Sequence, residues 1–213
     1  KTYPYRSSKS KLVEKLFNEL SKKIKKKIKP ENILEIGCND GTFASNFKLK
    51  NIVCIEPCRD VALEAKKKGL KVYINYFDKS LVKKLIKYHK KFDLIFSANT
   101  ITHISNYNSV FSNIYKILED SGTVIIEEPS LLETIKKNSY DQFYNEHIYV
   151  FSAIALQKIL KKNKLEIYDI ENINVHGGSN RYYIKKIKHK KIKTSLRFKK
   201  NILIEKNYGL HKF

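Results

Sequence analysis

Three residues of types that move protons stand together in 144-YNEHIYVFS-152, ahead of an apolar segment. His147 is a natural general base, because the ordinary pKa of histidine lies near neutrality. The phenol of Tyr144 is able to relay a proton or to hydrogen-bond a substrate, and the carboxylate of Glu146 to orient or anchor one. The stretch therefore predicts acid and base chemistry, with a purely structural His147 beside Glu146 as the competing interpretation.

A second candidate site is the segment 35-EIGCNDGTF-43, where a strand is expected to end at Gly37 and Gly41 to open the next helix. Gly37 allows a tight turn and a close approach of the backbone to a ligand. The segment is neither G-x-G-x-x-G nor a phosphate-cradling loop, because no lysine follows Gly41. Alone, it is equally well interpreted as an ordinary turn.

Glu56 makes a ligand more plausible than an ordinary turn. It ends the next strand, in 55-IEP-57, about 20 residues after the glycine loop. An acidic side chain at the carboxyl edge of an open α/β sheet accepts both hydroxyls of a ribose. The glycine loop and Glu56 together favour a cofactor that contains a nucleoside.

The elements that must position these residues alternate along the chain. Expected strands cover residues 32–37, 52–56, 70–74, 92–97, 122–128, 165–173 and 179–187. Expected helices cover residues 9–28, 60–69, 79–89, 107–118 and 152–163, the first with Leu12, Leu16, Leu20 and Ile24 on its apolar face. Strand and helix in alternation predict an α/β fold with right-handed crossovers and a mostly parallel, seven-stranded sheet. The last two strands follow each other without a helix, so we expect an antiparallel hairpin at one edge.

The formal charge of +22 invites a nucleic-acid interpretation, since clustered basic residues neutralise phosphates. However, only four of the 43 basic residues are arginine, and the lysines are scattered through the whole sequence. We therefore interpret the charge as a compositional bias that affects association and solubility. Nucleic acid is an unlikely partner on this evidence, and no apolar run is long enough to span a membrane, which favours a cytoplasmic protein.

The combination of motifs resembles one enzyme family. It consists of 3-YPYRSS-8, 35-EIGCNDG-41, 55-IEP-57, 98-ANTITHI-104, 127-EEP-129, 140-YDQFYNEHIYVFS-152 and 175-VHGGSNRYYI-184. The glycine loop, Glu56 and the strand order are similar to the Rossmann-like class I fold of S-adenosylmethionine-dependent methyltransferases. The full set resembles the sugar C-methyltransferases that act on nucleotide-linked 4-keto-6-deoxyhexoses.

This resemblance implies a role for most of the candidate residues. Proton transfer falls to His147, Tyr144 and His103, assisted by Glu146, and S-adenosylmethionine is the implied cofactor, with S-adenosylhomocysteine as its product. Cofactor contacts are expected at Gly37, Cys38, Asn39, Gly41, Glu56, Phe77 and Asn99. Contacts with the nucleotide-sugar are expected at Glu127, His176, Gly177, Gly178, Ser179 and Arg181. Arginine is rare in this chain, and the planar fork of Arg181 suits a diphosphate better than lysine does. His103 as a simple loop cap and 176-HGGSNR-181 as a hairpin turn without a ligand are the alternatives.

The sequence departs from that family in one respect. Family members usually carry an N-terminal zinc-binding domain with C-x-x-C pairs and a further C-terminal domain, and neither is found here. Cys38, Cys54 and Cys58 form no such pair, so we predict no metal site. The expected organisation is one methyltransferase domain over residues 1–187, with residues 1–29 as lead-in and helix, and a basic, partly helical tail from 188 to 213. Methylation of another small molecule or RNA, or a non-catalytic basic binding module, stays open as an alternative.

Overall fold

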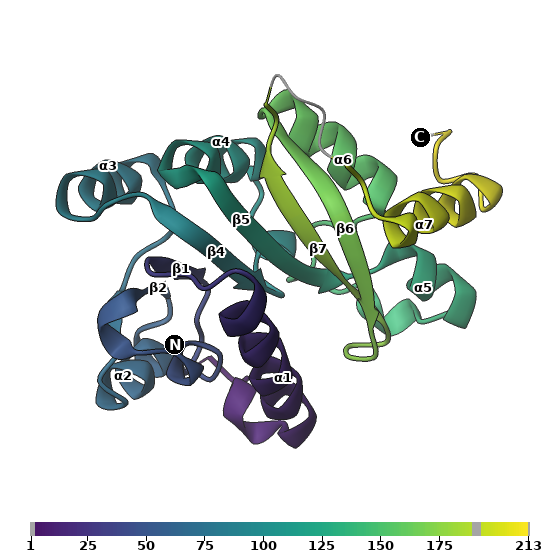
Figure 1. The fold of residues 1–213 in the computed structure, drawn as a ribbon. Coiled ribbons are helices and arrows are strands. Elements are labelled where there is room, and N and C mark those ends of the chain that lie inside the picture. The colour runs from purple at the N-terminus through teal and green to yellow at the C-terminus, as the bar shows by residue number, and fades with distance from the viewer. Residues whose placement is uncertain (1–2, 189–192, 213) are drawn as a thin grey trace. The chain divides into compact units, whose positions relative to one another are not determined.

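The computed structural model describes residues 3–188 and 193–212, in which strands and helices alternate (Figure 1). The strands are β1 (Ile33–Ile36), β2 (Ile52–Ile55), β3 (Lys71–Tyr73), β4 (Phe92–Ala98), β5 (Leu118–Pro129), β6 (Leu165–Ile173) and β7 (Ser179–Lys186). The helices are α1 (Lys11–Lys27), α2 (Arg59–Lys67), α3 (Lys79–Tyr88), α4 (Tyr107–Ile117), α5 (Leu131–Lys137), α6 (Ala153–Lys162) and α7 (Leu196–Asn207). All seven expected strands and all five expected helices are therefore present.

The described strands form a seven-stranded sheet in the order β3-β2-β1-β4-β5-β7-β6. β1 pairs in parallel with β2 and β4, and β2 pairs in parallel with β3. β7 runs antiparallel to both of its neighbours, β5 and β6. The predicted Rossmann-like sheet and its closing hairpin are confirmed, and the hairpin inserts β7 between β5 and the edge strand β6.

The chain divides into two compact units. Unit 1 consists of Lys1–Ser97 and Ile117–Glu119, and unit 2 consists of Ala98–Lys116 and Asp120–Phe213. The glycine loop and Glu56 belong to unit 1, whereas the Y-x-E-H stretch and the histidine of the loop after β4 belong to unit 2. Each unit therefore carries one half of the predicted chemistry.

The core of unit 1 is aromatic beneath the glycine loop. Phe43 stacks on Phe96 of β4 with ring centroids 3.7 Å apart, and Phe17 of α1 meets both rings edge-on. The expected apolar face of α1 is corrected here, because Leu12 is 51% exposed and the buried positions include Val13, Phe17, Leu20 and Ile24. Spacings of four, three and four residues follow the helical repeat more closely than a uniform four does.

In unit 2, α6 and α7 pack against β6 (Figure 1). Glu205 of α7 is fully buried, and its carboxylate accepts the backbone N–H groups of Ala153 and Ile154 at 2.7 and 2.8 Å, which caps the start of α6. The basic tail from residue 188, which was expected to be partly helical, contains α7, and the contacts of Glu205 dock this helix on α6. Residues 189–192 of that tail lie outside the described residues.

A short helix, α5, was not expected from the sequence. It follows Pro129, and Ser130 caps it by accepting the N–H of Glu133. Seven residues are too few to show a helical repeat in the sequence, so the expected helices do not include this segment. The helix matters because it packs beside the histidine-bearing turn described below.

Candidate active site

The glycine loop of unit 1 takes a backbone shape that requires glycine. Gly37, Asn39 and Gly41 all have positive φ angles, of 73°, 51° and 78°. A Cβ atom on Gly41 would lie 2.3 Å from the side chain of Leu70, so this position also needs the smallest residue for packing. The N–H groups of Gly37 and Cys38 both donate to the carbonyl of Ile55, which ties the loop to the end of β2.

Glu56 lies directly beside this loop. One carboxylate oxygen accepts the N–H of Asn39 at 2.9 Å, and the other accepts the N–H of Cys58 at 2.9 Å. Burial raises the pKa of the Glu56 carboxyl, against the opposite effect of these N–H groups. The side chain of Cys58 also hydrogen-bonds this carboxylate. A carboxylate offers about four acceptor positions, so it keeps acceptor capacity for a hydroxyl of a ribose. The residues present therefore fit a nucleoside cofactor.

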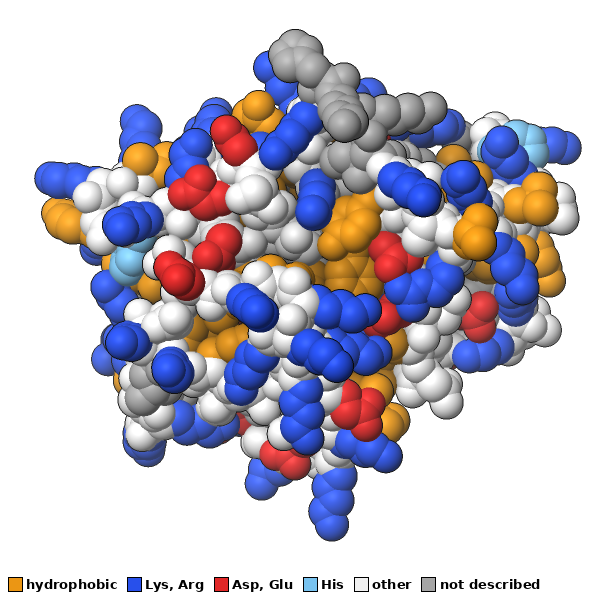
Figure 2. Space-filling model, viewed as in Figure 1, with side chains coloured by type: hydrophobic (Ala, Val, Ile, Leu, Met, Phe, Trp, Pro, Cys, Tyr) orange, Lys and Arg blue, Asp and Glu red, His pale blue; other side chains and the backbone are white. Residues whose placement is uncertain are grey.

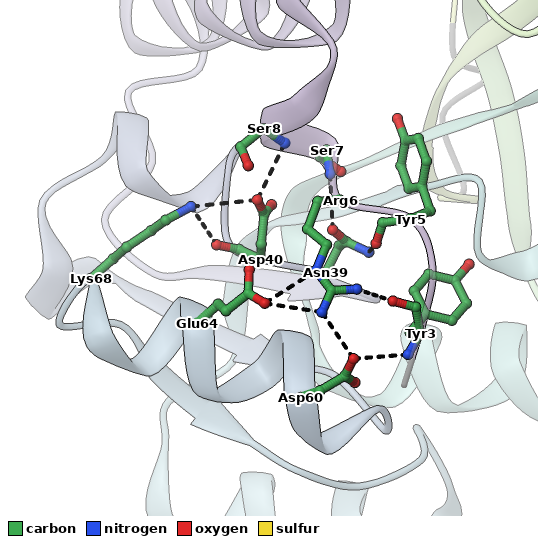
Figure 3. Close-up of polar contacts among 10 residues, drawn as sticks. All are labelled: Tyr3, Tyr5, Arg6, Ser7, Ser8, Asn39, Asp40, Asp60, Glu64 and Lys68. Atoms are coloured by element: carbon green, nitrogen blue, oxygen red, sulfur yellow. Dashed lines mark hydrogen bonds and ion pairs between the residues drawn. The ribbon is translucent and has the colours of Figure 1, made fainter. Parts of the chain in front are cut away.

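A segment that precedes α1 lies across the same loop. This N-terminal strap, residues 3–8, is joined to Asn39 by two hydrogen bonds: Ser7 N–H donates to Asn39 Oδ1 at 3.0 Å, and Asn39 Nδ2 donates to the carbonyl of Tyr5 at 3.1 Å (Figure 3). Ser8 N–H donates to Asp40 Oδ2 at 3.2 Å. The side chain of Asn39 thus holds the strap, while its backbone serves Glu56.

Arg6 fastens the other side of the strap to α2. Its guanidinium pairs with Asp60 at 2.9 Å and with Glu64 at 3.0 Å (Figure 3). The N–H of Tyr3 donates to the same Asp60 carboxylate at 2.8 Å. This latch was not predicted, although the strap sequence was part of the family resemblance.

The three other cofactor candidates differ in what the structure shows. Cys38 is buried, and its pKa is raised by a hydrogen bond with the thiol of Cys54 and by burial, so the side chain belongs to the core. Phe77 is buried after β3, and its neighbour Asp78 caps α3 by accepting the N–H of Leu81. Asn99 belongs to unit 2, where its buried Oδ1 atom has no hydrogen-bond partner among the described residues.

In unit 2, Tyr144 and His147 form a hydrogen-bonded pair. The Tyr144 hydroxyl lies 2.7 Å from Nε2 of His147, and Nδ1 of His147 lies 2.9 Å from the carbonyl of Gln142. A carbonyl only accepts, so Nδ1 carries the proton, and in the neutral ring Nε2 accepts the phenolic hydrogen. Tyr144 is 47% exposed, which leaves its oxygen open to a substrate.

His103 stands next to this pair, with its ring centroid 5.2 Å from that of His147. Burial lowers the pKa of His103 and the proximity of His147 lowers it further, while hydrogen bonds to the backbone of Glu146 and Asn99 oppose both effects. His103 is therefore neutral near pH 7, which suits a hydrogen-bond donor to a developing oxyanion. The structure thus brings together the predicted residues Tyr144, His147 and His103.

Glu146 acts on its neighbours mainly through charge. Its side chain is exposed, and after burial it is the second cause that raises the pKa of Tyr144. The phenol of Tyr144 therefore stays protonated at neutral pH, as a relay that starts with a proton on oxygen requires.

His176 occupies the turn that leads into β7. Its φ angle is 49°, a left-handed conformation that few residues other than glycine adopt. Burial lowers the pKa of His176, and His147 lowers it further through its charge. The two rings are thus electrostatic neighbours.

The glycine pair that follows is explained by packing. A Cβ atom on Gly177 would lie 3.2 Å from Gln142, and one on Gly178 would lie 2.8 Å from Glu133 of α5. The N–H of Gly178 and the hydroxyl of Ser179 both donate to the carbonyl of Val175. These two groups serve the turn itself, whereas the prediction had given them to a sugar or phosphate.

Arg181 and Glu127 form a buried ion ladder across three strands. Arg181 pairs with Glu127 of β5 at 2.6 Å and with Glu171 of β6 at 3.0 Å, and both carboxylates stand opposite it in the strand register. Arg181 Nη2 is buried without a partner among the described residues. Most of the guanidinium is therefore committed to the sheet, and only Nη2 is left for the predicted contact with a diphosphate.

Two classes of site are not found in the described part of the chain. Residues 3–188 and 193–212 contain no group of three or more metal-ligating side chains that could hold an ion. None of the described helices is long and apolar enough to cross a membrane.

Solved structures with the same fold define the class. A methyltransferase of Thermotoga maritima, described as a possible histamine N-methyltransferase, is 18% identical, with a TM-score of 0.61 over 83% of this chain and 90% of that chain. Magnesium protoporphyrin IX methyltransferase of Synechocystis PCC 6803, solved with S-adenosylhomocysteine bound, is 14% identical, with a TM-score of 0.59 over 82% of this chain and 83% of that chain. The fold is that of the S-adenosylmethionine-dependent methyltransferases.

Sequence comparison identifies the family. Residues 5–170 match the family described as methyltransferase domain, and the chain belongs to this family, whose cofactor is S-adenosylmethionine. C-methyltransferase NovU of Streptomyces niveus is 26% identical over 149 residues, 69% of this chain and 36% of that protein. Malonyl-acyl carrier protein O-methyltransferase 2 of Ilyobacter polytropus is 30% identical over 142 residues, 61% of this chain and 52% of that protein. The chain spans about a third to a half of the length of these two relatives.

Proposed function

We propose that this methyltransferase domain methylates carbon: it removes the proton next to the ketone of a nucleotide-linked 4-keto-deoxysugar and transfers a methyl group to that carbon. The observation that carries the proposal is the Tyr144–His147 pair, with Nδ1 of His147 on the carbonyl of Gln142 and Nε2 at 2.7 Å from the phenol. The similarity to a C-methyltransferase over 69% of the chain supports it.

The pair performs the proton transfer as a relay. As the carbon–hydrogen bond breaks, the proton passes to the Tyr144 oxygen, and the proton of Tyr144 passes to Nε2 of His147. The concerted transfer avoids a free phenolate, which the raised pKa of Tyr144 disfavours. The carbonyl of Gln142 stabilises the imidazolium that results, because it accepts the Nδ1 hydrogen throughout.

The electron pair released from carbon collects on the ketone oxygen as an enolate. Neutral His103 is the donor that we assign to this oxygen. S-adenosylmethionine supplies an electrophilic methyl group, and the enolate carbon takes it as the methyl–sulfur bond breaks. The proton on His147 then returns to solvent.

Exchange of the substrate's carbon-bound proton with deuterated water tests this assignment. We expect the proton next to the ketone to exchange about 100-fold more slowly, or slower still, in Tyr144→Phe and His147→Ala. The chain supplies a matched control in Tyr73 and His89 of unit 1, which form a second tyrosine–histidine pair at 3.0 Å. Tyr73→Phe and His89→Ala should exchange at the unmodified rate, and undiminished exchange in the Tyr144 and His147 variants would remove the pair from the mechanism.

Methylation of oxygen is the alternative raised by the second relative, whose name specifies an O-methyltransferase. Transfer to a carboxylate or hydroxyl breaks no carbon–hydrogen bond, so it needs no passage of a carbon-bound proton to Tyr144 and His147. Methyl transfer that continues without any exchange at carbon would favour this alternative.

A further inference from the structure

The two imidazoles of the candidate active site come from separate loops of unit 2. His103 ends the short 3₁₀ helix Ile101–His103 after β4, and His147 lies in the stretch between α5 and α6. Loops are the most mobile parts of a fold, and catalytic groups need positions fixed within about 0.5 Å. The rings of His103 and His147 are 5.2 Å apart. To keep this distance fixed, the two loops must be joined to each other by further contacts.

Thr102 makes this link. Its carbonyl accepts the N–H groups of Ile148 and Tyr149 at 3.0 and 3.4 Å, and its hydroxyl donates to the carbonyl of Tyr149. Thr102 is completely buried, so water does not compete for these bonds. The bonds join the residue before His103 to the residue after His147.

Glu128 anchors the linked loops to the sheet. Its Oε1 atom accepts the N–H groups of Thr100 at 3.2 Å and Ile101 at 2.8 Å, where the 3₁₀ helix begins. Glu128 stands near the end of β5, opposite Asn180 of β7, and is 1% exposed. A rigid strand thus holds the backbone two residues before His103.

The second oxygen of Glu128 shows the state of the carboxyl group. Oε2 is buried and has no hydrogen-bond partner among the described residues. Burial raises the pKa of Glu128 to about 8, against the opposite effect of the backbone N–H groups of Ile101, Thr100 and Thr102. Near neutral pH the group is therefore mostly a carboxylic acid, and a glutamine is nearly isosteric with it.

We propose that Thr102 and Glu128 are positioning residues that hold His103 and His147 as one imidazole pair. Their hydrogen bonds go to the backbone of the two loops, so we do not expect them to contact the reacting atoms. The value of the pair for catalysis rests on the proposed function, whereas the positioning itself is a property of the fold. It can be measured without substrate or cofactor.

The test is a nuclear magnetic resonance titration of the imidazole Cε1–H signals in the full chain, assigned with His103→Gln and His147→Gln. Thr102→Val removes the hydroxyl bond to Tyr149 and keeps the two bonds to the Thr102 carbonyl, whereas Glu128→Ala removes both side-chain bonds of Glu128. We expect the signals of both histidines to shift in each variant, less in Thr102→Val, and the pKa of His103 to rise toward its ordinary value, because the ring escapes burial and His147. Glu128→Gln should restore most of the original spectrum, because its amide oxygen accepts the same two N–H groups.

Glu205→Ala is the matched control for the loss of a buried glutamate. Glu205 also accepts two backbone N–H groups at the start of a helix, and it belongs to the same unit. This variant should be destabilised but should keep both histidine signals in place. Equal movement of the signals in Glu205→Ala would mean general loosening and would overturn the proposal.

Three further outcomes would also overturn it. The first is unchanged His103 and His147 signals in Thr102→Val. This result is sufficient by itself if the Glu128→Ala protein does not fold. The second is unchanged signals in a folded Glu128→Ala, and the third is a glutamine variant as perturbed as the alanine variant. Because no measurement uses substrate, a wrong assignment of the reaction would leave these results intact.

Discussion

Glu56 has a carboxylate that holds the glycine loop, and we assign the same carboxylate to the ribose of the cofactor. We expect Glu56→Ala to bind S-adenosylhomocysteine roughly 10- to 100-fold more weakly, because it loses hydrogen bonds between a charged acceptor and the ribose, worth about 1.5–3 kcal/mol each. Calorimetric titration of S-adenosylhomocysteine into both proteins measures the difference. A folded Glu56→Ala protein with undiminished affinity would contradict the assignment.

Glu128 should make the stability of the protein depend on pH in a defined direction. Its pKa in the folded protein is about 8, against an ordinary 4.5, so the folded state binds this proton more tightly than the unfolded state does. The resulting stability is fully present below pH 4.5 and is lost as the pH rises toward 8, at about 1.4 kcal/mol for each unit of pKa difference.

Urea unfolding at a series of pH values, compared between the natural chain and Glu128→Gln, isolates this contribution. The free energy of unfolding of the glutamine variant should fall less between pH 5 and 8. Parallel curves for the two proteins would show that Glu128 is ionised throughout this range, in both folded and unfolded states.

The types of the proton-moving residues could be predicted from sequence, but their partners could not. Tyr144, His147 and His103 meet as expected, because their side chains have few structural uses at such spacing. Arg181 was expected at a diphosphate because arginine is rare here, yet two carboxylates from neighbouring strands occupy most of its fork. Cross-strand register decides that pairing, and a single sequence does not reveal it.

At the scale of elements, the N-terminal strap is held to the cofactor loop mainly by one amide side chain. We expect Asn39→Ala to release residues 3–8, since both side-chain bonds, to Ser7 and Tyr5, are lost. Hydrogen exchange of the strap amides should accelerate about tenfold or more, as a loss of roughly 1.4 kcal/mol requires. Bound S-adenosylhomocysteine should reverse part of this effect if the strap belongs to the cofactor site.

Arg6→Ala separates the two attachments of the strap. Its ion pairs with Asp60 and Glu64 are partly exposed, and solvent screens such pairs, so we expect a smaller acceleration. Exchange that is faster in Arg6→Ala than in Asn39→Ala would show that α2, rather than the glycine loop, is the main anchor.

The bounds of long elements were predictable, whereas the short helix α5 was missed and the helix in the basic tail was expected without bounds. The strands 165–173 and 179–187 were placed within one residue of β6 and β7, because alternating or continuous apolar runs are bounded there by turn residues. α5 has seven residues and α7 carries an apolar face that is largely exposed, with Leu196 82% and Leu203 59% exposed, so periodicity gives little signal in either.

At the scale of the whole molecule, the net charge of +22 is spread widely. Figure 2 shows lysine and arginine side chains over the whole visible face, with acidic side chains among them. We expect weak binding to short single-stranded RNA that falls at least tenfold between about 50 and about 200 mM salt. Fluorescence anisotropy at both salt concentrations measures it, and tight binding that persists at the higher salt would favour RNA as a true substrate.

The capping of α6 by Glu205 also bears on the order in which the protein matures during synthesis. A ribosome releases the Y-x-E-H stretch well before α7, and domains fold as their last required segment emerges. Until residue 205 has been made, the first turn of α6, which follows directly on that stretch, lacks its two strongest backbone acceptors. The start of α6 in a nascent chain is therefore capped only once Glu205, 52 residues after Ala153, has emerged from the ribosome, so α6 and α7 are expected to dock in one step rather than in order of synthesis.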